Sequence, residues 1–373
     1  MAISPHRFVV LDSLRGICAL MVTLVHLNAY SIVKELPFFI NAYLFVDFFF
    51  VLSGFVIATN YQARLASGFG IQKFMLLRFG RLYPLYFVIL VCFFIAELLF
   101  EGPAAFASPQ KSFDTVLANI LLLQSFHIFS FDTWNWPGWS IATEFWTCLL
   151  FAVIVTMWPQ RLIAILAGLS IISLYIIATL TTTGINVTYN FGMLRSILGF
   201  STGVFVFDIW KKTSSFRIDE RLAFVAEMLC VIFVFLFVSA VAQSNYSLFA
   251  PFVFAVVVLV FAKESGPISS FLKHQIFVVL GLLSYSIYLV HLLIERMLVR
   301  ATLSIEAISG HQLITKVPHE GEIIDVLGLN LTQGNLWACL YLILVVGVAA
   351  LTYRYVEVPS RLWFRKQAQV ERP

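Results

Sequence analysis

The chain has 373 residues, of which 24 are Lys or Arg and 20 are Asp or Glu, so only 12% are charged. Its hydrophobic fraction is 60%, and its mean hydropathy is +0.92. Soluble domains average about 25% charged and about 45–50% apolar residues. This composition excludes a soluble domain, a disordered chain, a nucleic-acid-binding protein and a disulfide scaffold. It predicts an all-α, polytopic integral membrane protein.

Apolar segments long enough to cross a bilayer follow one another along the chain. A transmembrane helix needs about 20 predominantly apolar residues. About ten such segments are predicted, at 8–30, 41–61, 81–100, 138–158, 161–180, 191–210, 222–242, 246–262, 276–298 and 335–356. The stretch 115–131 is apolar but short, which makes it a candidate interfacial or re-entrant helix. The connection 299–334 is expected to form a solvated lid.

Basic residues alternate between successive connections. The basic set of connections contains Arg64, Lys73, Arg78, Arg81, Arg161, Lys211, Lys212, Arg217, Arg221, Lys263 and Lys273, and the C-terminal tail adds Arg361, Arg365 and Lys366. The intervening connections hold few Lys or Arg residues. By the positive-inside rule the basic set faces the cytoplasm. Both termini are then predicted to be cytoplasmic, which agrees with an even number of spans across an inner or plasma membrane.

Several ionisable residues lie inside the predicted spans, where they are costly and are functional candidates by default. Arg15 and His26 are separated by about three helical turns in the first span, so they share one face roughly 16 Å apart. Asp47, Glu144 and His291 come from three other spans at a depth similar to that of His26. These four outer groups predict a site. The alternatives are a snorkelling arginine with an unrelated core histidine, and a purely structural polar network.

A second, basic layer lies where the third span enters from the cytoplasm. Arg78 and Arg81 are one turn apart if this segment is helical. Arginine forks suit phosphate oxygens. Together with Arg15, which enters from the same side, they predict a site for an anionic cytosolic ligand. Ordinary positive-inside anchoring is the alternative for the two arginines taken alone.

Aromatic residues crowd the outer connection that leads into the fourth span. Trp136 and Trp139 offer flat rings on which the C–H faces of sugars stack, and Ser140 follows them. These residues and His291 are candidates for binding an acceptor. An aromatic belt at the membrane interface is the alternative for the tryptophans, and a structural hydrogen bond is the alternative for His291. No metal-ligand spacing is found, and no metal is predicted.

Six short motifs resemble one known family. LDSLRGICALMVTLVH (11–26) is similar to the arginine–ten residues–histidine signature of the acyltransferase type 3 family of polytopic membrane O-acyltransferases. VDFFFVLSGFVIA (46–58), RFGRLYP (78–84), WSIATE (139–144), SYSIYLVH (284–291) and YRYVEVPSRLWF (353–364) follow in the order of that family. The resemblance covers nearly the whole chain.

The resemblance implies transfer of an acyl group, commonly acetyl from acetyl-CoA, to a hydroxyl of a cell-surface or exported carbohydrate. His26 would act as general base, and Glu144 or Asp47 would orient its ring. A transient acyl-histidine is the variant mechanism. The three arginines of the basic layer would bind the CoA phosphates. Acyl-CoA is thus a substrate, and no permanently bound cofactor and no nucleic-acid partner are expected.

Residues 1–373 are expected to form a single transmembrane acyltransferase domain. Some members of the family append a soluble esterase-like domain, whereas this chain ends at Pro373, which argues against a two-module transfer to peptidoglycan. Two other functions stay open at this point. One is a multi-span transporter, although no internal repeat is found, and the other is a non-catalytic subunit of a polysaccharide export or modification machine.

Overall fold

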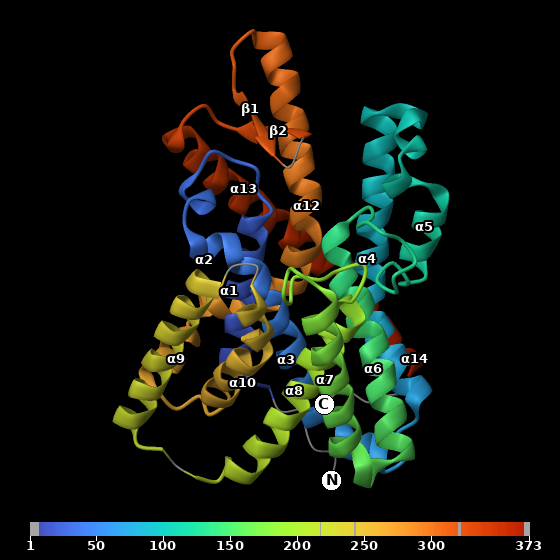
Figure 1. The fold of residues 1–373 in the computed structure, drawn as a ribbon, viewed down its shortest axis with the longest axis vertical. Helices are drawn as coiled ribbons and strands as arrows, with labels where there is room; N and C mark the ends of the chain where they lie inside the picture. The colour runs from blue at the N-terminus through green and yellow to red at the C-terminus, as the bar shows by residue number, and fades with distance from the viewer. Residues whose placement is uncertain (1–6, 217, 242–243, 320–321, 369–373) are drawn as a thin grey trace.

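The computed structural model describes residues 7–216, 218–241, 244–319 and 322–368, and helices account for nearly all of its regular structure (Figure 1). Within these ranges, eight helical segments are long and apolar enough to cross a membrane. A helix satisfies its backbone N–H and C=O groups internally, as a hydrocarbon environment requires. The prediction of an all-α, polytopic membrane protein is confirmed.

Each of the ten predicted segments contains a helix. The first seven helices are α1 (Val9–Val25), α2 (Pro37–Ile40), α3 (Phe45–Ala66), α4 (Ile71–Phe100), α5 (Phe113–Ile120), α6 (Trp139–Met157) and α7 (Leu162–Leu180). The others are α8 (Gly192–Thr213), α9 (Glu220–Val241), α10 (Ala250–Phe261), α11 (Pro267–Leu272), α12 (Gln275–Ser309), α13 (Leu331–Thr352) and α14 (Val358–Gln367). Helices α1 and α10 have only 17 and 12 residues, so the count of ten crossings stays a prediction. Residue 242, where one predicted span ends, lies outside the described residues.

Two boundaries differ from the sequence prediction in ways that matter for the site. Helix α4 begins at Ile71 and not at residue 81, so Arg78 and Arg81 lie one turn apart on a single helix. The stretch 115–131 contains most of the short helix α5, followed by irregular backbone. This segment is too short to cross a bilayer.

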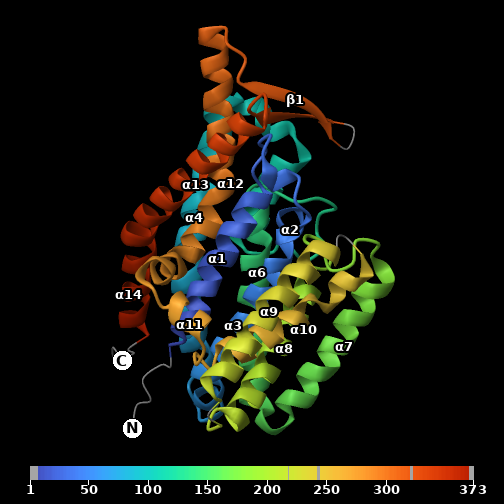
Figure 2. The ribbon, with the colours of Figure 1, turned by 90° about the vertical axis from the view of Figure 1, so that its left-hand side faces the viewer.

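The connection 299–334 is more ordered than an irregular loop. Helix α12 continues to Ser309, and two antiparallel strands follow, β1 (Ile314–His319) and β2 (Glu322–Leu327). An isolated bridge joins Ala29 to Leu327. The hairpin therefore pairs with the chain just beyond the end of α1, at the upper end of the molecule (Figure 2).

Helices α1 and α12 pack with their backbones in direct contact at two glycines. A Cβ atom added to Gly16 would lie 2.5 Å from the carbonyl carbon of Leu280, and one added to Gly281 would lie 2.4 Å from an α1 carbonyl oxygen. Glycines permit such close approach between membrane helices. Gly54 of α3 does the same against α8, since its added Cβ would lie 2.0 Å from the Phe200 oxygen.

Replacing Gly281 by valine is expected to lower the thermal stability of the detergent-solubilised protein. The new side chain would overlap the α1 backbone, which cannot rotate away, and overpacking costs typically about 1–3 kcal/mol. The melting temperature, followed by tryptophan fluorescence, measures the effect. Gly347→Val on α13 is the control, because nothing lies within 4 Å of a Cβ there. Equal melting temperatures for the two variants would contradict the packing described.

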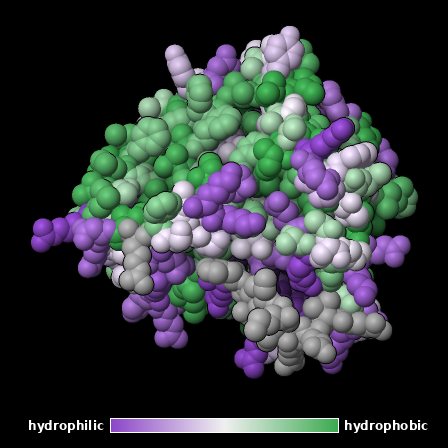
Figure 3. All heavy atoms as spheres, turned by 90° about the horizontal axis from the view of Figure 1, so that it is seen from below, coloured by the Kyte–Doolittle hydropathy of each residue, from purple (hydrophilic) through white to green (hydrophobic). Residues whose placement is uncertain are grey.

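The lower end of the molecule has the features expected of a cytoplasmic face. Helix α1 begins there and α14 ends there (Figure 2). Hydrophilic side chains gather across this end, and hydrophobic side chains surround much of its margin (Figure 3). That the two helices share one end agrees with an even number of crossings. The side of the membrane they face rests on the positive-inside rule and stays a prediction.

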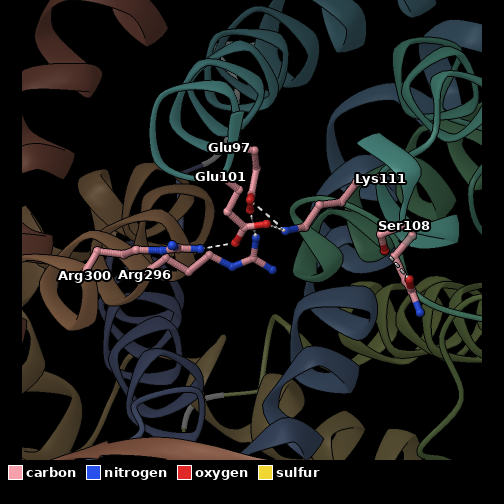
Figure 4. Close-up of polar contacts among 7 residues, drawn as sticks. Glu97, Glu101, Ser108, Lys111, Arg296 and Arg300 are labelled. Carbon is pink, nitrogen blue, oxygen red and sulfur yellow. Dashed lines mark hydrogen bonds and ion pairs between the residues drawn. The ribbon is translucent and has the colours of Figure 1, made fainter. Parts of the chain in front are cut away.

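Ion pairs join α4 to α12 near the upper end (Figure 4). Glu97 pairs with Arg296 and with Lys111, each at 2.7 Å between nitrogen and oxygen. Glu101 pairs with Lys111 at 3.3 Å and with Arg300. A network of this kind is worth more than isolated surface pairs. It holds the two long helices and the connection after α4 together.

Candidate active site

Helix α1 presents both residues of the predicted pair to α12. The Nε of Arg15 donates to the Ser284 hydroxyl at 2.8 Å, and its Nη2 donates to the Gly281 carbonyl at 3.1 Å. His26 is the C-cap of α1, and its Nδ1 lies 3.2 Å from Nε2 of His291 on α12. Both residues meet the same neighbouring helix, so the predicted shared face is observed.

The His26 ring is partly buried between α1, α12 and the connection before α6. Its Nδ1 lies 2.7 Å from the Val22 carbonyl oxygen. The Trp136 ring meets it edge-on, with centroids 4.6 Å apart. His291 is fully buried, and its Nδ1 lies 2.6 Å from the Tyr288 carbonyl oxygen. Three residues singled out from the sequence, His26, Trp136 and His291, thus gather in one place.

Glu144, expected to orient His26, has other partners. Its Oε1 accepts from Nη2 of Arg78 at 2.5 Å and from the Ser53 hydroxyl at 2.7 Å. Both members of this ion pair are mostly buried. An ion pair in such surroundings is screened less than one at the surface. The structure thus places Glu144 in the basic layer, with Arg78.

Asp47, the other carboxylate expected beside His26, forms an ion pair with Arg195, a residue that was not predicted to take part in the site. Its two carboxylate oxygens accept from Nε and Nη2 of Arg195 at 3.0 and 2.8 Å. The side chains are 0% and 2% exposed. The Trp139 ring lies under the guanidinium at 5.3 Å. An arginine within the apolar segment 191–210 was the available signal.

The basic layer contains a further cation, Arg361 of α14, near the end of the chain. Arg81 lies close enough to Arg15 and Arg361 for electrostatic repulsion. Its guanidinium makes no hydrogen bond or ion pair with the residues that the structure describes. Glu357 partly balances the charge, pairing with Arg361 at 3.4 Å. The sequence pattern placed Arg361 only among the basic residues of the C-terminal tail and Glu357 only in the motif 353–364, so neither was predicted to lie in this layer.

The remaining candidates for acceptor binding are packed in the interior. The Ser140 hydroxyl lies 2.8 Å from the Tyr288 hydroxyl and donates to the Pro137 carbonyl at 3.1 Å. Ser140 and Trp139 are each 5% exposed. Of the four candidates, Trp136 and His291 therefore lie at the His26 ring, while Trp139 and Ser140 support the surrounding structure.

Asp132 lies in the outer connection before α6, near these aromatic residues. Burial raises the pKa of Asp132 to about 6, although the Thr188 hydroxyl donates to its Oδ2 at 3.0 Å and opposes the shift. An unfolded aspartate titrates near pH 4. The folded protein therefore binds more protons, and the contribution of Asp132 to stability falls as the pH rises from about 4 to about 6.

The site thus has two levels, named outer and inner after the orientation that the positive-inside rule predicts. The outer level holds a pair of imidazoles, which can take a proton from a hydroxyl group. The inner level holds several guanidinium groups, which can bind a polyanion through charge-assisted hydrogen bonds. Helices α1 and α12 contribute residues to both levels, since Arg15 and Ser284 meet at one and His26 and His291 at the other.

Comparison with known proteins gives one family and two relatives. A family model described as an acyltransferase domain matches residues 8–363. Protein 2 in the picA locus of Rhizobium radiobacter is 46% identical over 83 residues, covering 22% of this chain and 41% of that protein. The peptidoglycan O-acetyltransferase OatA of Listeria monocytogenes is 26% identical over 380 residues, covering 94% of this chain and 55% of that protein. The chain thus spans about half the length of each relative. No solved structure matches the chain.

Proposed function

The chain belongs to the acyltransferase domain family, whose model matches residues 8–363, and on this basis we propose that it transfers an acyl group from cytosolic acyl-CoA to a carbohydrate hydroxyl. The observation that carries the proposal is the two-level site. The imidazoles of His26 and His291 and the guanidinium of Arg15 lie along the contact between α1 and α12, and Arg81 of α4 lies beside Arg15. The acetyl group and a cell-surface or exported carbohydrate are the proposed cargo and acceptor. The name of the OatA relative supports both. The proposed location is the inner or plasma membrane.

The inner level would bind the phosphates of the acyl-CoA. Among the described residues, the guanidinium of Arg81 has no hydrogen-bond partner. The Nε of Arg78 is buried and also has no partner among them. Arg15 lies beside Arg81 and extends the binding site toward the contact between α1 and α12. Guanidinium groups match phosphate oxygens in a bidentate geometry. Glu144 would act as a positioning residue that holds Arg78 in place.

The outer level would carry out the chemistry. His26 would take the proton from the carbohydrate hydroxyl as its oxygen attacks the thioester carbon. The carbon–sulfur bond then breaks, the acyl group stays on the carbohydrate oxygen, and the CoA thiolate leaves with the proton as a thiol. In the variant, His26 attacks first and a transient acyl-histidine passes the acyl group on. Trp136 lies against the His26 ring and would contact the acceptor.

Reconstitution in proteoliposomes tests the proposed function. Acetyl-CoA labelled on the acetyl group is supplied on the basic face and a carbohydrate acceptor on the other. We expect free CoA thiol and labelled carbohydrate in equal amounts. A transporter would accumulate label without cleaving the thioester, and a non-catalytic subunit would give neither result. Either outcome would refute the proposal.

Replacing Arg81 by methionine is expected to raise the KM for acetyl-CoA about 10- to 100-fold, because hydrogen bonds to charged groups contribute about 1.5–3 kcal/mol. The maximal rate should change little. Initial rates over a range of acetyl-CoA concentrations measure both. Arg221→Met, at an exposed arginine at the start of α9, is the control.

Acetyl-pantetheine as the donor tests whether Arg81 acts on the phosphates, because this donor lacks the phosphates that Arg81 would bind. The Arg81→Met variant and the unmodified protein should use it equally well. An equal loss with both donors would show that Arg81 does not act on the phosphates.

A further inference from the structure

His291 is the closest polar side chain to the His26 ring among the described contacts, and the structural hydrogen bond expected for it accounts for only one of its two ring nitrogens. It is fully buried on α12. Its Nε2 faces Nδ1 of His26 at 3.2 Å, and its Nδ1 faces the Tyr288 carbonyl oxygen at 2.6 Å. An acceptor sugar would have to displace these contacts, so direct acceptor binding does not fit.

The carbonyl partners determine which ring nitrogens carry hydrogen. A carbonyl oxygen only accepts hydrogen bonds, so Nδ1 of His291 is the donor to Tyr288. A neutral His291 therefore has its lone pair on Nε2. By the same reasoning, Nδ1 of His26 is the donor to the Val22 carbonyl. The hydrogen on Nδ1 of His26 then also lies within reach of the His291 lone pair.

We infer that His291 is a positioning residue that, together with the Val22 carbonyl, holds His26 in the tautomer protonated at Nδ1, which leaves Nε2 of His26 to act as the base. This inference rests on the proposed function, in which His26 takes the hydroxyl proton. His291 thereby has the role of the carboxylate in a catalytic triad, which is to hold the imidazole in the correct tautomer. The two carboxylates expected in that part, Asp47 and Glu144, pair with arginines.

The proton balance of the reaction fits this arrangement. The hydroxyl proton moves to Nε2 of His26, which becomes a cation while keeping its hydrogen on Nδ1. That hydrogen is shared between the Val22 carbonyl and Nε2 of His291. A hydrogen bond to a charged group is stronger than one between neutral groups. The proton then leaves Nε2 for the CoA thiolate, and both histidines return to their starting state.

A buried tyrosine, Tyr341, links the backbones of the two helices that carry His26 and His291. The Tyr341 hydroxyl of α13 lies 3.1 Å from the His291 carbonyl oxygen and 3.4 Å from the Thr23 carbonyl oxygen. It therefore links the backbones of α12 and α1 one turn from His26. Positioning by a supporting shell of this kind is what a functional pair needs to stay within reach.

Nitrogen-15 NMR of labelled histidine in lipid nanodiscs tests the inference without using activity, because the two ring nitrogens have distinct shifts in each tautomer. His26 signals are assigned by their loss in His26→Gln. We expect Nδ1 of His26 to be protonated at neutral pH. In His291→Leu we expect a mixture of tautomers and a maximal rate about 10- to 100-fold lower, with an unchanged KM for acetyl-CoA. His291→Gln, which keeps an accepting oxygen, should recover most of both.

The controls separate this inference from the proposed function. His274→Leu, the same change at an exposed histidine that precedes α12, should alter neither readout. If His291→Leu does not fold, His291→Gln and Tyr341→Phe in the NMR experiment still report on the tautomer. A His26 protonated at Nε2 in the unmodified protein would overturn the inference, as would an unchanged tautomer and rate in His291→Leu. If the tautomer is as inferred but thioester cleavage is absent, the proposed function fails on its own.

Discussion

Replacing His26 by glutamine is expected to lower the rate of acyl transfer about 10²- to 10⁴-fold, the contribution typical of a general base. Glutamine has a similar size and keeps an N–H group that can donate to the Val22 carbonyl, so the end of α1 should stay intact. It cannot take a proton from a hydroxyl at neutral pH. Thioester cleavage by purified protein in proteoliposomes measures the loss.

The matched control is His311→Gln, at an exposed histidine in the outer connection. It should leave the rate unchanged. Size-exclusion chromatography and the melting temperature must show that the His26 variant is folded and inserted. A folded His26→Gln protein with undiminished transfer would mean that another group is the base.

Removing one partner of the Asp47–Arg195 ion pair should have the largest effect on stability. Both side chains lie inside the helix bundle, 0% and 2% exposed. Breaking such a pair leaves an uncompensated buried charge, which costs about 3–5 kcal/mol. Arg195→Met alone should therefore lower the melting temperature strongly. The double variant Asp47→Asn with Arg195→Met should recover most of the loss, because it removes both charges.

An exposed ion pair is the control for this prediction. Lys212 and Asp208 are 2.7 Å apart on α8, with side chains 73% and 46% exposed. Exposed helix pairs contribute only about 0.3–0.5 kcal/mol, so Lys212→Met should shift the melting temperature little. If the double variant at Asp47 and Arg195 is no more stable than Arg195→Met, the uncompensated charge of Asp47 is not what destabilises the single variant, and this account of its energetics is wrong.

Features set by periodicity along one helix could be predicted from the sequence. Arg15 and His26 share a face because a helix repeats every 3.6 residues. The depth of His291 followed from the direction in which its span was expected to run. The helical composition followed from the scarcity of charge. Each of these properties depends on one segment and on the bilayer, so no knowledge of neighbouring helices was required.

Features set by how helices rotate against one another could not be predicted. Asp47 and Glu144 were expected beside His26, but the structure pairs them with Arg195 and Arg78, and these partners depend on which faces of α3, α4, α6 and α8 meet. The close approach at Gly16 brings α12 to α1, and its effect on the two histidines is visible only in three dimensions. Depth alone cannot distinguish an imidazole from a guanidinium as the neighbour of a carboxylate.

The distance along the chain between Asp47 and Arg195 has a consequence for how the protein is made. The two residues are 148 positions apart, and ribosomes add about 5–20 residues per second. Helix α3 therefore exists for roughly 7–30 s before Arg195 has been synthesised. During that time the Asp47 carboxylate lacks the partner that neutralises it in the folded protein, and an unpaired carboxylate within a membrane span is costly. The buried Asp47–Arg195 pair can therefore form only after α8 has been synthesised.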